Sequence, residues 1–388
     1  MITLHTRAAR YVNINKLSER TIYRVETSRS VPNALRSKLA FIFDGGDMPS
    51  GFGIYILVKS LLPSPNLGDA LPFVVVPESF AYLSSGDIIK IDAPNNALRT
   101  LFRKHASANG LLLTERCNNY CLMCSQPPRD VNDSHLYNEL SAMIELIDHD
   151  PHELVFSGGE PTLLGGHFIE LVRSAKSYLP RTAIHVLSNG RNFSDYSLSE
   201  TLASVAHPDL MVGIPLYSDV SYIHDYVVQA DGAYDETVRG ILNLKQAGVA
   251  VEIRVVLHKQ TVPRLRYLAE FITRNLLFVD QVVLMGLEIT GFTKINIDEL
   301  WIDPADYIME LRDAVGILTR AKIKTSIYNT QLCLLPDELR PLAKKSISDW
   351  KREYLPICGS CSIKHECGGF FSFGQERPSR KIAPVSAN

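Results

Sequence analysis

The sequence predicts an α/β chain: a partial (β/α)6 parallel barrel between a small β-rich N-terminal domain and a cysteine-rich C-terminal domain. From Gly110 to about Ile289, near-continuous apolar runs alternate with amphipathic helical stretches, as expected for parallel strands covered on both faces. The preceding residues hold short apolar runs broken by Gly, Pro and Asp. Four of the seven cysteines lie in the last part of the chain. With 388 residues, the chain can form two or three domains, which we expect at 1–105, 106–300 and 301–388.

The composition indicates a globular protein, with 46% hydrophobic and 21% charged residues. The net charge is −2, and no Lys/Arg block is longer than a pair or two, so we expect no nucleic-acid partner. The N-terminal residues lack an apolar signal region, and no stretch is long enough to cross a bilayer. We therefore expect a cytoplasmic protein without a membrane partner. Disulfides are not expected in that compartment, so the clustering of cysteines indicates metal ligation.

In the N-terminal region, four short apolar runs predict strands, at Phe41–Phe43, Gly53–Val58, Phe73–Val76 and Ile88–Ile91. Gly86–Asp92 resembles a turn followed by an alternating strand. No residue pattern here indicates chemistry. We expect this domain to pack against the rest of the chain, with binding of a leader peptide or partner as the alternative.

The barrel strands are predicted from apolar runs at Leu111–Thr114, Leu154–Ser157, Ala183–Ser188, Met211–Tyr217, Val251–Leu257 and Gln281–Leu287. Ser134 can cap a helix whose apolar face carries residues from Leu136 to Ile147. A second helix is expected between Leu265 and Leu276, and Gly248 fits the position just after the end of a helix. Parallel sheets place their sites at the carboxyl ends of the strands, where the motifs below fall.

Cys117, Cys121 and Cys124 form a CxxxCxxC motif directly after the first predicted barrel strand. Three thiolates can bind three irons of a cubane cluster, but they cannot complete the usual set of four cysteines. The remaining iron is open, and open metal positions are where catalysis takes place. A small zinc site or buried free thiols are the alternatives.

The second predicted barrel strand ends in Gly158-Gly159-Glu160, followed by Pro161. Two glycines allow the main chain to approach a ligand without a Cβ atom in the way. The alternative is a plain turn in which Pro161 begins a helix.

The cysteine spacing, its place at a strand end and the later Ser-Gly-Gly-Glu-Pro resemble the radical S-adenosylmethionine (SAM) enzymes. This resemblance implies a partial barrel that holds a [4Fe-4S] cluster on Cys117, Cys121 and Cys124, with SAM on the fourth iron. An electron from the cluster then cleaves SAM and releases a 5′-deoxyadenosyl radical, which takes hydrogen from the substrate. The residues that it implies at the SAM site are Gly158, Gly159, Glu160, Ser188, Asn189, Ser218, Arg254 and Met285.

Each implied role has an alternative. The main-chain carbonyls at Gly158 and Gly159 and the Glu160 carboxylate are expected to receive the SAM ammonium. Ser188 and Asn189 fit the methionine carboxylate or ribose, but turn chemistry also explains Asn-Gly.

Ser218, after the fourth predicted strand, and Arg254, in the fifth, match positions that the resemblance to the radical SAM enzymes implies contact SAM. Arg254 shares its strand face with Glu252, so a structural ion pair is the alternative there. Met285 is expected beside the adenine, with core packing as the alternative for its neighbours.

The second metal motif is Cys358-x2-Cys361-x5-Cys367, which resembles the auxiliary-cluster domains called SPASM or twitch. Only four cysteines remain for it, so we expect one auxiliary [4Fe-4S] cluster with Cys333 as the fourth ligand. Complete cysteine ligation indicates electron relay or substrate orientation rather than SAM binding. Zinc on the same four thiolates is the alternative.

The segment 111–130, the segment 285–292 and the last cysteine motif are similar to the His-Xaa-Ser system radical SAM maturases called HxsC. The resemblance implies a ribosomally made peptide substrate with His-Xaa-Ser repeats and a second radical SAM protein as partner. An electron donor of the flavodoxin or ferredoxin type is also expected. Two alternatives remain: a radical SAM enzyme for a nucleobase or other small molecule, and a non-catalytic iron–sulfur or zinc protein.

Overall fold

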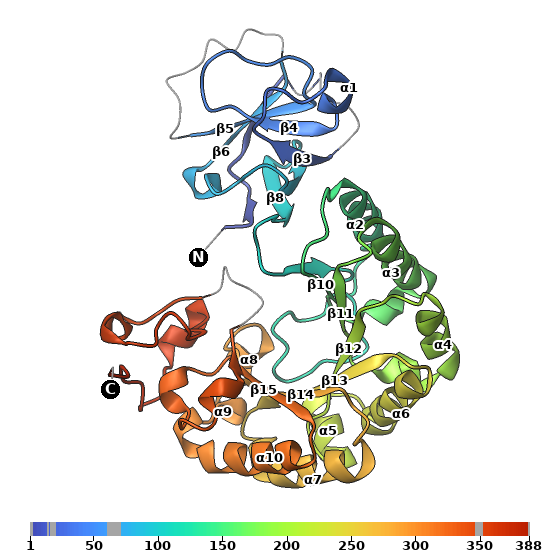
Figure 1. The fold of residues 1–388 in the computed structure, drawn as a ribbon, viewed down its shortest axis with the longest axis vertical. Helices are drawn as coiled ribbons and strands as arrows, with labels where there is room; N and C mark the ends of the chain where they lie inside the picture. The colour runs from blue at the N-terminus through green and yellow to red at the C-terminus, as the bar shows by residue number, and fades with distance from the viewer. Residues whose placement is uncertain (1–2, 14, 16–20, 60–70, 346–351, 387–388) are drawn as a thin grey trace.

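The computed structural model describes residues 3–13, 15, 21–59, 71–345 and 352–386. Within these residues the strands form two sheets of eight strands each. The N-terminal sheet lies at the top of Figure 1, and the second sheet curves through the lower part of the molecule. The chain thus separates a β-rich unit from a barrel-like unit, as the sequence predicts.

The N-terminal sheet is mixed and has the order β1-β8-β7-β3-β4-β5-β6-β2. Its strands are β1 (His5–Thr6), β2 (Arg10–Val12), β3 (Ile22–Glu26), β4 (Leu39–Ile42), β5 (Ile54–Val58), β6 (Phe73–Val76), β7 (Ile88–Asp92) and β8 (Ala97–Phe102). Four of them confirm the predicted apolar runs. Alternate residues of β4 and β5 enter two hydrophobic clusters, so both faces of this sheet are covered.

The second sheet is wholly parallel, and its strands follow chain order from β9 to β16. They are β9 (Asn109–Leu112), β10 (Glu153–Ser157), β11 (Ala183–Leu187), β12 (Leu210–Pro215), β13 (Ala250–Leu257), β14 (Gln281–Gly286), β15 (Lys324–Tyr328) and β16 (Ala343–Lys344). The partial parallel barrel is confirmed.

The predicted number of six barrel strands is wrong, because β15 and β16 extend the sheet. The run Lys-Thr-Ser-Ile-Tyr of β15 is not continuously apolar, and β16 has two residues. Neither has the pattern of a strand buried on both faces. Both lie in the predicted third domain, so part of the segment 301–388 belongs to the barrel sheet.

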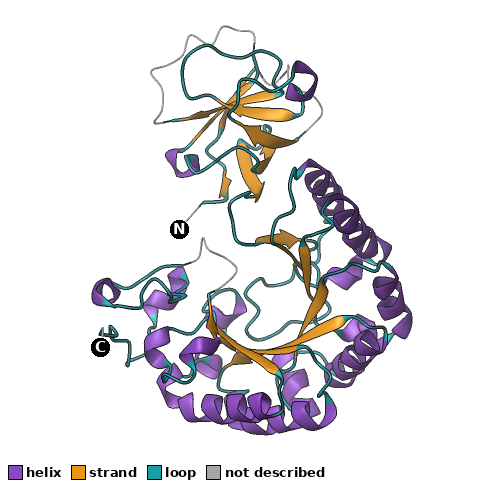
Figure 2. Ribbon diagram, in the orientation of Figure 1, coloured by secondary structure: helices purple, strands orange, loops and turns teal. Residues whose placement is uncertain are grey.

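Helices cover the convex side of this sheet, and its concave side faces loops (Figure 2). The helices of the described residues outside the N-terminal sheet are α2 (His135–Leu146), α3 (Gly166–Tyr178), α4 (Tyr196–Ser204), α5 (Ser221–Val228), α6 (Ala233–Gln246), α7 (Leu265–Asn275), α8 (Phe292–Ile295), α9 (Ile297–Leu300) and α10 (Ile308–Arg320). The apolar faces of α2, α7 and α10 are buried in one large core with the strands, and for α2 and α7 this confirms the predicted helices.

The structure confirms one of the two predicted helix ends, Gly248 after α6, but not the predicted cap of α2 by Ser134. Gly248 has φ +85°, and its N–H donates to the carbonyl of Lys245 at 3.0 Å, which confirms the glycine after α6. Ser134 makes no capping bond to α2, so that part of the prediction is wrong. Its hydroxyl lies 2.9 Å from Asn132 Oδ1 instead, because residue 134 already has helical φ and ψ angles.

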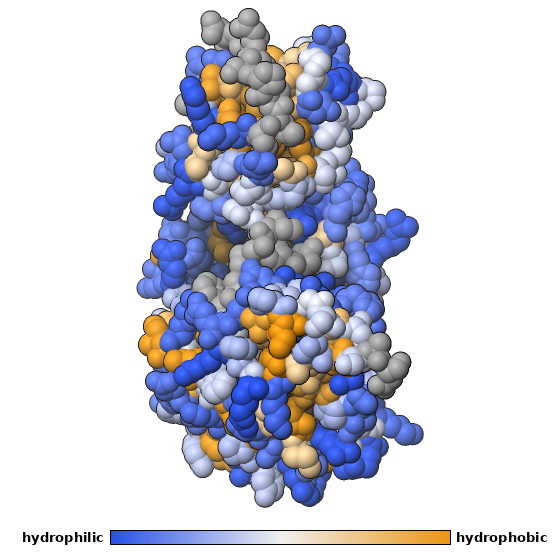
Figure 3. Space-filling model, turned by 90° about the vertical axis from the view of Figure 1, so that its left-hand side faces the viewer, coloured by the Kyte–Doolittle hydropathy of each residue, from blue (hydrophilic) through white to orange (hydrophobic). Residues whose placement is uncertain are grey.

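The side of the molecule that carries the C-terminal segment is seen face-on in Figure 3. Hydrophobic residues are visible at the top of this face, beside the grey residues, and gather again in its lower half, with mainly hydrophilic residues between. Among the described residues, no helix combines the length and apolar character that a membrane-spanning helix requires.

Candidate functional site

Cys117, Cys121 and Cys124 lie in the loop between β9 and α2, at the carboxyl end of the parallel sheet. Main-chain hydrogen bonds hold this loop from three sides. Glu160 N–H donates to Arg116 O at 2.8 Å, and the N–H of Leu122 donates to Val227 O in α5 at 2.9 Å. The N–H of Phe292 donates to Cys124 O at 2.8 Å. The loop is therefore fixed by segments that are far apart in sequence.

The three thiols of this loop are partly buried and lie close enough to influence one another. Burial raises the pKa of all three; that of Cys117 rises to about 11, with the charges of Glu160 and Cys124 adding to the effect. The Cys117 sulfur also accepts hydrogen bonds from Asn119 N–H at 3.4 Å and from Asn189 Nδ2 at 4.0 Å. The structure thus brings the three predicted ligands together and supplies donors to one of them.

Gly158 and Gly159 bring the end of β10 against the cysteine loop. A Cβ atom on Gly159 would lie 2.0 Å from Arg116 O, and one on Gly158 would lie 2.4 Å from Thr114 O. Gly158 also has φ +144°. The absence of side chains thus permits close approach to the protein's own loop. Contact of the same main chain with SAM stays a prediction.

Glu160 is fully buried at the end of β10. Its Oε1 accepts from Thr162 N–H, from Thr162 Oγ1 and from Ser188 Oγ, and its Oε2 accepts from Asn189 N–H at 2.7 Å. Burial raises its pKa against the effect of these donors. The carboxylate thereby joins the ends of β10 and β11. Its predicted bond to the SAM ammonium stays a prediction.

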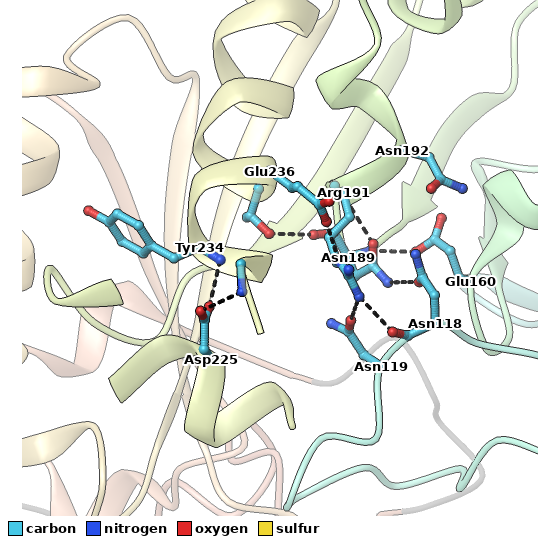
Figure 4. Close-up of polar contacts among 12 residues, drawn as sticks. Asn118, Asn119, Glu160, Asn189, Arg191, Asn192, Asp225, Tyr234 and Glu236 are labelled. Carbon is cyan, nitrogen blue, oxygen red and sulfur yellow. Dashed lines mark hydrogen bonds and ion pairs between the residues drawn. The ribbon is translucent and has the colours of Figure 1, made fainter. Parts of the chain in front are cut away.

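A polar network continues from Asn189 toward the cysteine loop (Figure 4). Asn189 Nδ2 donates to Asn118 Oδ1 at 2.6 Å. Arg191 donates from Nη1 to Asn118 O and to Asn119 Oδ1, at 2.6 and 2.7 Å, and from Nε to Glu236 at 2.5 Å. This guanidinium fastens the residues after Cys117 to α6.

Sequence reasoning missed Asn118, Asn119 and Arg191 in this network. Their positions carried a signal, because Asn118 and Asn119 follow Cys117 directly and Arg191 follows the predicted Ser188-Asn189-Gly190 turn. Residues next to a motif at the carboxyl end of a strand lie at the same edge of the sheet as the motif, so they can contact the same site.

Arg254 lies on the concave face of β13 and forms the ion pair that the period of two predicts. Its Nη1 lies 2.8 Å from Glu252 Oε1, and its Nη2 donates to Met285 Sδ at 3.3 Å. His185 Nε2 lies 3.5 Å from the same Glu252 oxygen. A Cβ on the intervening Gly213 would lie 2.9 Å from His185 Nε2, so this glycine makes room for the buried ion pair.

These contacts favour the structural alternative for Arg254, and its contact with SAM stays a prediction. Met285 lies beside Arg254 on the same face of the sheet, and its place beside the adenine stays a prediction. Ser218 is fully buried after β12, and its Oγ accepts from Val220 N–H at 3.1 Å. Its role toward SAM is likewise a prediction. The predicted site residues therefore lie along the carboxyl ends and the concave face of the sheet.

The four remaining cysteines line one small pocket outside the sheet, and they are Cys333, Cys358, Cys361 and Cys367. Burial raises the pKa of Cys333, and the charges of the other three also act on it. The Cys367 sulfur accepts from Gly369 N–H at 3.4 Å. The pairing of Cys333 with the CxxCx5C motif is thus a spatial fact, whereas the cluster that it would hold is a prediction.

Both cysteine groups suit iron–sulfur clusters in their donor chemistry. All seven cysteines are free thiols, and backbone N–H groups point at sulfurs in both sites. In the described part of the chain, no three His, Cys, Asp or Glu side chains converge as ligands of a single metal ion. A cubane does not need such convergence, because each cysteine binds a different iron.

Comparison with known proteins agrees with this arrangement. Residues 111–272 match the family described as "Radical SAM superfamily". The chain is also 30% identical over 156 residues to the Fe-coproporphyrin III synthase of Methanosarcina barkeri (strain Fusaro / DSM 804). That match covers 39% of this chain and 37% of the relative, so the chain spans little more than a third of its length.

Solved structures also resemble the chain. One is the crystal structure of Streptococcus suis SuiB bound to S-adenosylmethionine. The match covers 58% of this chain and 51% of the SuiB chain, with 16% identity and a TM-score of 0.47. Native anSMEcpe with bound AdoMet covers 56% of this chain and 62% of its own, with 18% identity and a TM-score of 0.44. Residues 111–272 of this chain are thus similar to the radical SAM superfamily, and they include the first strands of the parallel half-barrel.

Proposed function

We propose that the chain is a radical SAM enzyme whose Cys117, Cys121 and Cys124 hold a [4Fe-4S] cluster with one iron left for SAM. The observation that carries this proposal is the gathering of three thiols, in a family-matched region, at the carboxyl end of a parallel half-barrel. When bound and reduced, the cluster would supply the electron that cleaves SAM to methionine and a 5′-deoxyadenosyl radical.

The chain's own residues would position the reactants. The cysteine loop is fixed by Glu160, Asn189 and Arg191, so its thiols are held before a cluster binds. The glycines at the end of β10 keep this loop close to the strand. On the concave face, the ion pair of Arg254 with Glu252 orients the guanidinium beside Met285, and these side chains would contact SAM when it is bound.

Anaerobic reconstitution tests this proposal. The protein is loaded with iron and sulfide, reduced with dithionite and incubated with SAM, and 5′-deoxyadenosine is measured by mass spectrometry. We expect about eight irons per chain if both sites hold cubanes, together with 5′-deoxyadenosine above the protein-free control. A fully loaded protein that releases no 5′-deoxyadenosine would refute the enzymatic function.

For the substrate, we propose a ribosomally made peptide with His-Xaa-Ser repeats. The resemblance of segments 111–130 and 285–292 to the HxsC maturases supports it, together with the second cysteine site. A second radical SAM protein as partner, a flavodoxin- or ferredoxin-type donor and a cytoplasmic location belong to the same proposal. Incubation with a synthetic His-Xaa-Ser repeat peptide should then change the mass of that peptide in a SAM-dependent way.

A second candidate is a tetrapyrrole substrate, favoured by the 30% identity to Fe-coproporphyrin III synthase. The same assay with an iron coproporphyrin in place of the peptide separates the two. SAM-dependent change of the porphyrin, with the peptide unchanged, would support the small-molecule alternative.

A further inference from the structure

The segment Arg377–Val385 crosses from the barrel sheet's carboxyl end to the second cysteine site. At its start, the Arg377 guanidinium lies 5.0 Å from the centre of the Trp301 ring, which follows α9. At its other end, Val385 N–H donates to Cys361 Sγ at 3.4 Å. One short stretch of chain thus contacts both the barrel and a predicted cluster ligand.

The first half of this segment is anchored on the buried carboxylate of Asp303. Ser379 Oγ donates to Asp303 Oδ1 at 2.5 Å, and Arg380 N–H donates to Oδ2 at 3.1 Å. The Arg380 guanidinium adds an ion pair to the same oxygen at 3.0 Å. Asp303 and Ser379 are 4% and 7% exposed, so these bonds are shielded from water.

The second half forms a wall of the second cysteine pocket. Ile382 and Ala383 line this pocket together with the four cysteines. The Val385 carbonyl accepts from Ser362 N–H at 2.9 Å and from Ser362 Oγ at 2.8 Å, which fixes the orientation of the Val385 peptide beside Cys361.

We propose that Val385 is a positioning residue that sets the reduction potential of a cluster on Cys333, Cys358, Cys361 and Cys367. This inference rests on the proposed auxiliary [4Fe-4S] cluster and adds to it how the chain tunes that cluster. Hydrogen bonds to the cysteine sulfurs are one of the determinants of cluster potential. Reduction adds negative charge to the sulfurs, so N–H donors stabilise the reduced form and raise the potential.

The test replaces Val385 by Pro, which removes one N–H donor. It uses the full chain with Cys117, Cys121 and Cys124 changed to Ala, so that only the second cluster assembles. Iron and sulfide are counted after anaerobic reconstitution, and the potential is measured by a redox titration followed by electron paramagnetic resonance. Val385→Ala is the matched control, because it shortens the side chain and keeps the N–H.

We expect four irons per chain in the parent and in both variants, with a more negative potential for Val385→Pro alone. Equal potentials for the Pro and Ala variants would overturn the inference while leaving the cluster proposal intact. Absence of iron from the parent chain would instead refute the auxiliary cluster itself. The two failures are therefore distinguishable.

If Val385→Pro does not load iron, Ser362→Ala decides the question. It removes one of the two donors that orient Val385, and it leaves every backbone N–H in place. Ser360→Ala is its control, since within the described residues Ser360 Oγ forms one hydrogen bond, to the Ile357 carbonyl at 3.4 Å. We expect a more negative potential for Ser362→Ala than for Ser360→Ala, and equal values would overturn the inference.

Discussion

The first cysteine site lies on the carboxyl ends of strands, whereas the second lies among short 3₁₀ helices outside the sheet. Cys117, Cys121 and Cys124 follow β9, and their loop is bonded to the end of β10 and to α5. Cys333 lies in the short helix η7 (Leu332–Leu334) and Cys358 in η10 (Pro356–Ser360). Strands and helices hold the first site in place. The second site is held by single hydrogen bonds and by the segment Arg377–Val385.

This difference indicates how each site obtains its rigidity. In the first site the strand ladder fixes the strand ends, and the buried Glu160 and the partly buried Arg191 fasten the loop to them. In the second site a single β-bridge, between Glu353 and Phe370, is found near the cysteines in the described residues. We therefore expect the fold around the second site to depend more on a bound metal cluster than the fold around the first site, because metal binding and folding are coupled in many small metal sites.

The largest expected effect comes from removing the cysteines of one site at a time. Changing Cys117, Cys121 and Cys124 to Ala should abolish 5′-deoxyadenosine formation and halve the iron content, because only the second cluster remains. Changing Cys358 and Cys361 to Ala should halve the iron but leave SAM cleavage. Cleavage that survives the first change would contradict the assignment of the SAM site.

A methyl group on Gly159, which is closely packed against the first cysteine loop, should destabilise the first cysteine site and leave the second unchanged. Gly159→Ala places a Cβ atom 2.0 Å from Arg116 O, so we expect a loss of about 3 kcal/mol or more in the free energy of unfolding. Gly166→Ala is the control, since its Cβ would meet nothing within 4 Å. Urea unfolding measures both.

The corresponding glycine of the second site is Gly369, with φ +69° and a Cβ position 2.5 Å from Glu353 O. Gly369→Ala should lower the iron content of the second site alone. Loss of iron from both sites in either glycine variant would show that the two sites are not independently built.

Acid should destabilise the neighbourhood of the first site through a buried histidine. Burial lowers the pKa of His224 to about 4, and its Nδ1 accepts from Tyr217 N–H at 3.2 Å. In the unfolded chain the His224 imidazole is protonated below about pH 6.5, whereas in the native chain it is protonated only below about pH 4. Stability contributed by the neutral ring is thus complete above pH 6.5 and falls by about 3 kcal/mol as the pH drops to 4.

His224→Asn should reduce this loss, since the amide oxygen can accept the same hydrogen bond and does not titrate. Urea unfolding between pH 7 and 4 measures the slope. His365→Asn is the control in the second site, where the side chain is 74% exposed. An unchanged slope for His224→Asn would contradict the role of that ring.

The smallest loss in the free energy of unfolding is expected for Arg191, whose guanidinium joins the first cysteine loop to α6. Arg191→Met removes its bonds to Asn118, Asn119 and Glu236, so we expect a loss of about 2 kcal/mol in the free energy of unfolding. Arg181→Met breaks an exposed ion pair with Asp150 and should cost less than about 1 kcal/mol. Equal losses would show that the Arg191 network does not stabilise the loop.

The first cysteine site was predictable because its three cysteines are close in sequence. The CxxxCxxC spacing places three thiols in one loop, and an apolar strand before it places that loop at the edge of a parallel sheet. The ion pair of Arg254 with Glu252 followed from the period of two along β13. His185, which reaches the same carboxylate across Gly213, was not predictable, because it lies on a strand far away in sequence.

The sequence by itself determined the parallel half-barrel, the β-rich N-terminal sheet and the two groups of cysteines, because periodicity and spacing are local properties. Only the tertiary structure decided that β15 and β16 extend the barrel sheet. It also placed Cys333 in one pocket with the other three cysteines, a pairing that the sequence predicted from the number of remaining cysteines. It also decided that Glu160 is enclosed by the protein's own donors. These outcomes depend on which distant segments pack together, and packing is settled by the whole core rather than by any one stretch of residues.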